Sequence, residues 1–93
     1  MSKPVEFVVA YDITDDKERD KVADILKDFG FRVQKSVFEC RIVKSDLDVL
    51  IKRLDKLNLE TGFVKIYRIH KNSKRYVIGN NPGSIDDDTI FIV

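Results

Sequence analysis

Asp12 is the residue whose type and position point most clearly to chemistry. It directly follows the apolar segment VVAY at 8–11 and precedes ITDD at 13–16. Strand ends hold functional groups on rigid supports, and a carboxylate there suits Mg²⁺ or Mn²⁺, which prefer oxygen ligands. The plain alternative is a turn-forming aspartate that bonds to nearby backbone. One carboxylate is too few for a metal site, so a metal-binding role predicts a dimer that brings two copies of Asp12 together.

Basic residues supply groups that could contact phosphate. Arg19, Arg32, Lys35 and Arg41 follow Asp12, although most basic residues on a charged domain are simply solvated. No acidic residue occurs between Thr61 and Ile85, a stretch that contains Lys65, Arg68, Lys71, Lys74 and Arg75. Because the acids at 86–88 follow the last basic residue, residues 1–79 hold 17 basic and 13 acidic side chains, a net charge of +4. This distribution favours a polyanionic partner.

Several other kinds of site are excluded. The single histidine, His70, cannot form a multi-histidine metal cluster, and the single cysteine, Cys40, cannot form an internal disulfide or a thiolate metal site. A P-loop, a GxGxxG motif, a Ser/His/Asp set and the aromatic motif of an RRM sheet are all missing from the sequence. No apolar run approaches the roughly 20 residues of a membrane span. We therefore expect a soluble protein of a reducing cytoplasm, with no membrane partner.

The first half of the sequence predicts the elements that position Asp12. Residues 5–11 read as a central strand that is apolar on most of both faces. Asp15 with Glu18 three residues later predicts a helix start resembling a capping box, an apolar stripe continues to Phe29, and Gly30 is predicted to end the helix. Residues 31–43 are β-rich, as two strands or one long strand bent at Lys35 and Ser36.

The second half repeats this pattern and adds a tail. Ser45 with Asp48 predicts the start of a second helix, whose apolar stripe runs to Leu57. Residues 63–70 and 75–79 read as strands, 80–84 as a loop, 86–88 as solvated acids and 89–93 as a last short strand.

This order predicts an α+β fold, a ferredoxin-like βαββαβ sandwich with an extra C-terminal strand. The domain comprises residues 1–79, and residues 80–93 form a C-terminal extension. Both helices would cover one face of the sheet and leave the other face open. We expect Phe38, Ile42, Val64 and Ile66 to make that open face apolar, so a second copy of the chain would cover it.

Taken together, the motifs resemble the small CRISPR-associated Cas-two family over residues 5 to about 79. The most specific parts are the strand end YDITDD, Arg19 in the first helix, and FRVQKSVFE at 31–39. The resemblance implies a ferredoxin-like homodimer whose sheets face each other. It also implies that the tail strand at 75–79 crosses to extend the partner's sheet.

The resemblance also implies an activity and a site. Asp12 would hold Mg²⁺ (or Mn²⁺) between protomers as the catalytic and metal-binding residue of an endonuclease that hydrolyses phosphodiester bonds in RNA and/or DNA. Tyr11, Ser36 and Phe38 would support the site, Arg19 and Arg32 would neutralise phosphate, and Lys71, Lys74 and Arg75 would bind the strand. The alternative is a non-catalytic dimer that bridges the CRISPR integrase and binds DNA during spacer acquisition. A third possibility, a small-molecule sensor domain of the same fold, fits the basic charge less well.

Overall fold

The strand that carries Asp12 lies inside a four-stranded antiparallel sheet. The computed structural model describes residues 3–79 and 90–92. The strand order is β2-β3-β1-β4, and the chain order is β1-α1-β2-β3-α2-β4, as the sequence predicts. The bounds are β1 (Val5–Ile13), α1 (Asp16–Lys27), β2 (Gly30–Gln34), β3 (Val37–Ile42), α2 (Lys44–Asp55) and β4 (Gly62–Ile69). The ferredoxin-like α+β fold is thus confirmed.

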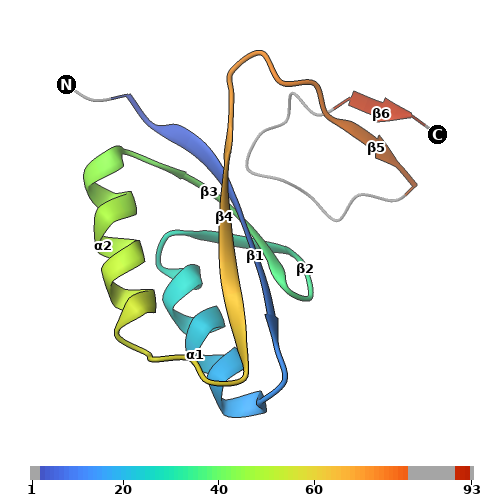
Figure 1. The fold of residues 1–93 in the computed structure, drawn as a ribbon. Helices are drawn as coiled ribbons and strands as arrows, with labels where there is room; N and C mark the ends of the chain where they lie inside the picture. The colour runs from blue at the N-terminus through green and yellow to red at the C-terminus, as the bar shows by residue number, and fades with distance from the viewer. Residues whose placement is uncertain (1–2, 80–89, 93) are drawn as a thin grey trace.

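The core lies between one face of this sheet and the two helices, which stand side by side (Figure 1). Val9 is paired with Phe38 on β3 and with Ile66 on β4, so these three side chains share a face. Val9 and Phe38 are fully buried in one cluster with Leu26 of α1 and Leu50 of α2. Odd-numbered residues of β1 therefore face the helices, and even-numbered residues face the other side.

The expected composition of the open face was wrong. Phe38 and Ile42 are buried, and Val64 and Ile66 pack against the same core, so all four lie on the helix side. Alternation separates the two faces of each strand but does not say which face the helices cover. The register assigns a different apolar set to the open face: Val8, Ala10, Phe31, Val37, Phe63, Tyr67 and Ile69. Phe63 and Tyr67 are each half exposed there.

The helix boundaries agree with the prediction at one end of α1 and differ elsewhere. Asp15 is the N-cap of α1, and its side chain accepts a hydrogen bond from the Glu18 amide. The helix ends at Lys27, and Gly30 belongs to β2 instead of capping the helix. A Cβ at Gly30 would lie 2.1 Å from the Glu39 carbonyl oxygen, so this glycine permits close strand pairing. α2 begins one residue before Ser45, after an extended Val43 that has no side-chain cap.

The β2–β3 bend and the presence of short strands within 75–79 and 89–93 agree with the prediction. Lys35 and Ser36 form the turn between β2 and β3. The tail contains β5 (Tyr76–Ile78) and β6 (Ile90–Ile92), which pair in parallel as a separate small sheet. Residue Arg75, just before β5, forms an ion pair with Glu6 of β1. The predicted loop at 80–84 and the acids at 86–88 lie outside the described residues.

Each of the two helices has 12 residues. In the described part of the chain, no helix is long and apolar enough to cross a membrane.

Candidate active site

Asp12 lies beside a hollow of about 400 Å³ at the C-terminal end of β1. We call it the Asp12 hollow; it is lined by Tyr11, Asp12, Ile13, Arg19, Asp20, Arg32, Lys35 and Ser36. Asp12 is exposed, is paired with Phe63 of β4, and belongs to the open-face set of β1. Within residues 3–79 its carboxylate has neither a hydrogen bond nor an ion pair, so the turn-forming alternative finds no support. The carboxylate is therefore exposed and available to bind a ligand.

Tyr11 attaches one side of this strand end to the β2–β3 turn. Its hydroxyl donates to the Lys35 carbonyl oxygen at 3.2 Å, and its amide donates to the Ser36 carbonyl oxygen at 3.0 Å. The Tyr11 and Phe38 ring centroids are 6.4 Å apart, and the Arg32 guanidinium lies 5.3 Å from the Phe38 centroid. Of the predicted supporting residues, Tyr11 and Ser36 line the hollow, whereas Phe38 is buried in the core next to Tyr11. Arg32 places a cation at the edge of the hollow, since its side chain is exposed.

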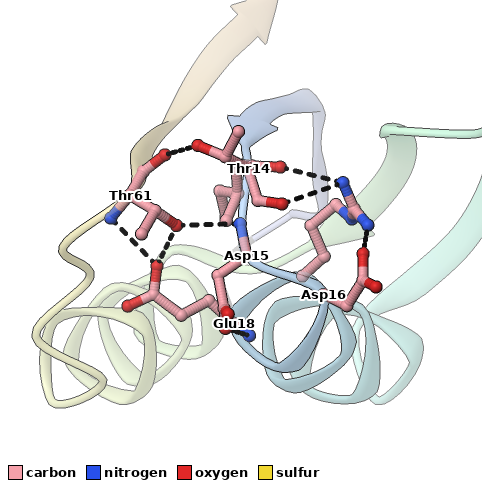
Figure 2. Close-up of polar contacts among 7 residues, drawn as sticks. Thr14, Asp15, Asp16, Glu18 and Thr61 are labelled. Carbon is pink, nitrogen blue, oxygen red and sulfur yellow. Dashed lines mark hydrogen bonds and ion pairs between the residues drawn. The ribbon is translucent and has the colours of Figure 1, made fainter.

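Arg19 fixes the backbone immediately after Asp12. Its guanidinium donates to the carbonyl oxygens of Ile13 at 3.2 Å and Thr14 at 3.4 Å, and it forms an ion pair with Asp16 (Figure 2). The side chain is 38% exposed and lines the hollow, while one guanidinium nitrogen donates to the strand end and the other terminal nitrogen pairs with Asp16. In a single chain Arg19 is thus a structural tie as well as a candidate phosphate ligand.

Glu18 and Thr61 join the other side of the strand end to the α2–β4 loop, a feature that the sequence analysis missed. One Glu18 carboxylate oxygen accepts the Glu60 amide at 2.9 Å, and the other accepts both the amide and the hydroxyl of Thr61. The Thr61 hydroxyl oxygen accepts the Asp15 amide at 3.1 Å, and the Thr61 carbonyl accepts the amide and hydroxyl of Thr14 (Figure 2). We call this set of contacts the Glu18–Thr61 clamp.

The clamp explains why Glu18 does not complete a capping box. In a capping box, Glu18 would accept the Asp15 amide, but here the Thr61 hydroxyl takes that position. Hydrogen bonds from the Thr61 side chain and then from the Glu60 amide stabilise the carboxylate, and they hold the pKa of Glu18 below its usual value. The sequence showed Glu18 near the helix start, but its hydrogen-bond partners Glu60 and Thr61 lie 42 and 43 residues away.

The other predicted nucleic-acid ligands are not in the Asp12 hollow. Lys71 lines a second hollow of about 500 Å³, here called the basic groove, at the N-terminal end of β1. Its lining is Lys3, Pro4, Val5, Glu6, Arg41, Arg68, Ile69 and Lys71. Arg75 is paired with Glu6 at the same end, and Lys74 is exposed. Six residue-to-residue steps along β1, about 20 Å at 3.3 Å per step, separate Glu6 from Asp12.

A divalent cation fits this site only when two chains contribute. Among residues 3–79 and 90–92, no three His, Cys, Asp or Glu side chains come together as a metal cluster. Asp12 supplies one unpartnered carboxylate, while the Ile13 and Thr14 carbonyls are engaged by Arg19. Two symmetry-related carboxylates with several waters would suit Mg²⁺ or Mn²⁺.

Cys40 and His70 stand apart from the site. Cys40 is buried in the core, and burial, followed by the nearby Glu39 charge, raises the pKa of its thiol to about 11. His70 follows β4 at the end of the sheet opposite Asp12. Neither residue can serve as a base or nucleophile in the Asp12 hollow.

Comparisons with known proteins agree with this geometry. The family model for CRISPR associated protein Cas2, written Cas-two above, matches residues 5–77. The CRISPR-associated endoribonuclease Cas2 3 of Synechocystis sp. is 55% identical over 51 residues, which are 55% of this chain and 55% of that protein. The alignment thus spans about half the length of that relative.

A second relative and a solved structure cover nearly the full chain. The CRISPR-associated endoribonuclease Cas2 1 of Thermodesulfovibrio yellowstonii is 33% identical over 89 residues, with 95% of this chain and 97% of that protein covered. The crystal structure of hypothetical protein TT1823 from Thermus thermophilus superposes with a TM-score of 0.76 at 37% identity, covering 87% of this chain and 98% of that one. The chain therefore belongs to the CRISPR-associated Cas2 family.

Proposed function

We propose that this chain is a metal-dependent endonuclease of a CRISPR system, which hydrolyses phosphodiester bonds in RNA and/or DNA. The observation that carries the proposal is the exposed Asp12 carboxylate, which lies unpartnered on a strand end tied down on both sides. Arg19, Arg32 and Lys35 bring positive charge to the same hollow. Several family members, including those of Synechocystis and Thermodesulfovibrio, carry the name endoribonuclease, which supports a nuclease activity.

The working unit in this proposal is a homodimer joined through the open face of the sheet. That face presents half-exposed Phe63 and Tyr67 together with Asp12, so covering it with a second copy buries apolar surface and brings the two carboxylates towards one axis. β4 and β5 each have one neighbouring strand in the described sheets. We propose that β5 crosses to the β4 edge of the partner. In this arrangement residues 1–79, which include β5, form the domain, and residues 80–93 form a C-terminal extension.

Each residue of the hollow then has a defined task. When bound by the two Asp12 carboxylates, Mg²⁺ or Mn²⁺ would polarise the phosphate and lower the pKa of a bound water. Arg32 and Lys35 would neutralise phosphate oxygens, and Arg19 would hold the strand end while facing the same phosphate. Lys71 and Lys74 would bind the backbone of the nucleic acid farther along, without reading its sequence.

The second candidate is a dimeric scaffold that binds DNA and bridges the CRISPR integrase during spacer acquisition. The observation that favours it is the basic groove, whose cations Lys3, Arg41, Arg68 and Lys71 lie far from Asp12 and could bind DNA without it. Both roles would suit a cytoplasmic protein.

Replacing Asp12 tests the proposed nuclease activity. The purified full chain, Asp12→Asn and the control Asp20→Asn are assayed with RNA and duplex DNA in Mg²⁺ and Mn²⁺, and binding is measured in parallel. Asp20 lines the same hollow from α1, so the control removes equal charge there. We expect Asp12→Asn alone to abolish cleavage while binding persists, because an amide is a poor ligand for a hard cation. Absence of cleavage by the wild type with every metal would favour the scaffold.

Charge placed on the open face tests the homodimer. Tyr67 and Val49 are 50% and 49% exposed, but Tyr67 lies on the open face and Val49 on α2. Tyr67→Glu should lower the molecular mass in solution to that of a monomer, and Val49→Glu should leave a dimer. A monomeric wild type would refute the two-chain site.

A further inference from the structure

The Asp12 carboxylate has no contact of its own within the described residues that fixes its position. Its place is therefore set by the backbone of β1 at Asp12 and Ile13, which are paired with Phe63 and Gly62 of β4. These are the last pairs of the β1–β4 ladder, and the end of a ladder frays unless something ties it. The contacts just beyond this end therefore decide how firmly the carboxylate is held.

We propose that Glu18 and Thr61 are positioning residues for the Asp12 centre, and that their clamp sets the separation of the two carboxylates that share one cation. This inference rests on the proposed function. Thr61 directly precedes β4, and through its carbonyl and hydroxyl it holds Thr14 and Asp15, the residues that directly follow β1. Glu18 in turn orients Thr61 from the first turn of α1. The clamp thus holds together the end of β1, the start of β4 and the first turn of α1.

The hydrogen-bond count explains why the Thr61 hydroxyl is suited to this task. The hydroxyl donates its one proton to Glu18 and accepts the Asp15 amide at 3.1 Å, so it uses both kinds of capacity at once. Valine has nearly the shape of threonine but can do neither, whereas serine can do both. Glu18 accepts at both oxygens, and a glutamine there would present a donor to the amide of Glu60 or of Thr61.

An ordinary structural role would predict a loss of stability alone. A positioning role predicts a change at Asp12, because a shift of about 1 Å in a catalytic group can lower a rate by about 100-fold. The same shift would misplace each carboxylate relative to the other, which weakens the shared cation site. Binding of nucleic acid through the basic groove at the opposite end of β1 would not change.

The experiment compares full-length dimers of the wild type, Thr61→Val, Thr61→Ser and Glu18→Gln. Arg53→Met is the control, because it removes another exposed polar contact between elements, the 3.0 Å pair of Arg53 in α2 with Asp28, the C-cap of α1, away from β1. The measurements are Mn²⁺ affinity from the electron paramagnetic resonance signal of free Mn²⁺, kcat and KM at saturating metal, and hydrogen exchange of the Thr14 and Asp15 amides.

Thr61→Val and Glu18→Gln should bind Mn²⁺ about 10-fold more weakly and lower kcat about 10- to 100-fold, with KM for nucleic acid within about twofold of the wild type. Exchange at Thr14 and Asp15 should quicken. Thr61→Ser and Arg53→Met should match the wild type in all three measurements. Wild-type Mn²⁺ affinity and kcat in both Thr61→Val and Glu18→Gln would overturn the inference, as would failure of serine to restore them. A wild type that neither binds Mn²⁺ nor cleaves would instead overturn the proposed function, and the positioning role with it.

Discussion

Replacing Gly62 with alanine should move the backbone of Asp12 itself. A Cβ built at Gly62 would lie 1.9 Å from the Asp12 carbonyl oxygen, 2.7 Å from the Ile13 Cα and 2.8 Å from the Asp12 carbonyl carbon. Real Cβ atoms essentially never approach closer than 3.0 Å. All three obstructing atoms are backbone, so no side-chain rotation can relieve the contact. β1 and β4 must therefore separate by about 1.1 Å at the site, the difference between 1.9 Å and 3.0 Å.

This displacement should reduce activity more than stability. Overpacking of this kind costs about 1–3 kcal/mol in the free energy of unfolding, so most of the protein remains folded at 25 °C. A displacement of about 1 Å at a group that must meet its symmetry mate should lower kcat by about 100-fold. The assay is metal-dependent cleavage per folded dimer, with the folded fraction taken from a urea titration of the same preparation.

Gly30→Ala is the matched control for this experiment. Its Cβ would lie 2.1 Å from the Glu39 carbonyl oxygen and 2.9 Å from the Cys40 Cα, a comparable collision between β2 and β3. We expect a similar loss of stability with kcat per folded dimer within about threefold of the wild type, since Asp12 does not move. Equal losses of kcat in the two variants would show that strand separation at Asp12 is not what limits cleavage.

Three further predictions concern other groups. Hydrogen bonds from Thr61 and Glu60, aided by the Lys21 charge, hold the pKa of Glu18 below the ordinary value of 4.5. The ionised Glu18 therefore stabilises the folded state fully above pH 4.5, and this stabilisation is lost as the pH falls through the lowered pKa. The wild type should exceed Glu18→Gln in urea midpoint at pH 7, and the difference between the two midpoints should shrink at pH 3.5. Burial raises the pKa of the Cys40 thiol to about 11, so iodoacetamide at pH 8 should label the native protein far more slowly than the protein in urea; equal rates by mass spectrometry would contradict this. Lys71→Ala with Lys74→Ala should weaken nucleic-acid binding, and the slope of log affinity against log salt should fall by about 0.7–0.9 per lost phosphate contact.

The elements could be predicted from the sequence because their signals are local. Alternation along 5–11 predicted β1, Asp15 predicted the start of α1, and Lys35 with Ser36 predicted the β2–β3 turn. The family motif also named Tyr11, Arg19, Arg32 and Ser36, and the structure places all four at the Asp12 hollow, whereas Phe38, which the motif also named, is a core residue that does not line it. Each of these signals lies within a short window of the sequence, so it can be read without knowing which distant segments come into contact.

The features that could not be predicted depend on contacts between distant segments. Phe38 was assigned to the wrong face because only the pairing with Val9 shows which side of β3 meets the helices. Glu18 accepts hydrogen bonds from Thr61, which is 43 residues away in the sequence, and Gly62 of β4 packs against the Asp12 carbonyl of the neighbouring strand β1. None of these contacts has a signature in neighbouring residues, so the support of the Asp12 strand end became visible only in three dimensions.

Because side chains along β1 alternate between the two faces of the sheet, the length of this strand can change only by an even number of residues without exchanging the faces. Tyr11 and Asp12 are neighbours in the chain, but one belongs to the core and the other to the opposite surface. Adding or deleting a single residue within 5–11 would exchange these destinations, placing a carboxylate in the core and turning the tyrosine outward. Changes of two residues would restore them. We therefore expect natural variants of this protein to vary freely in the length of the segment at 70–75, but to change the length of the first strand in even steps.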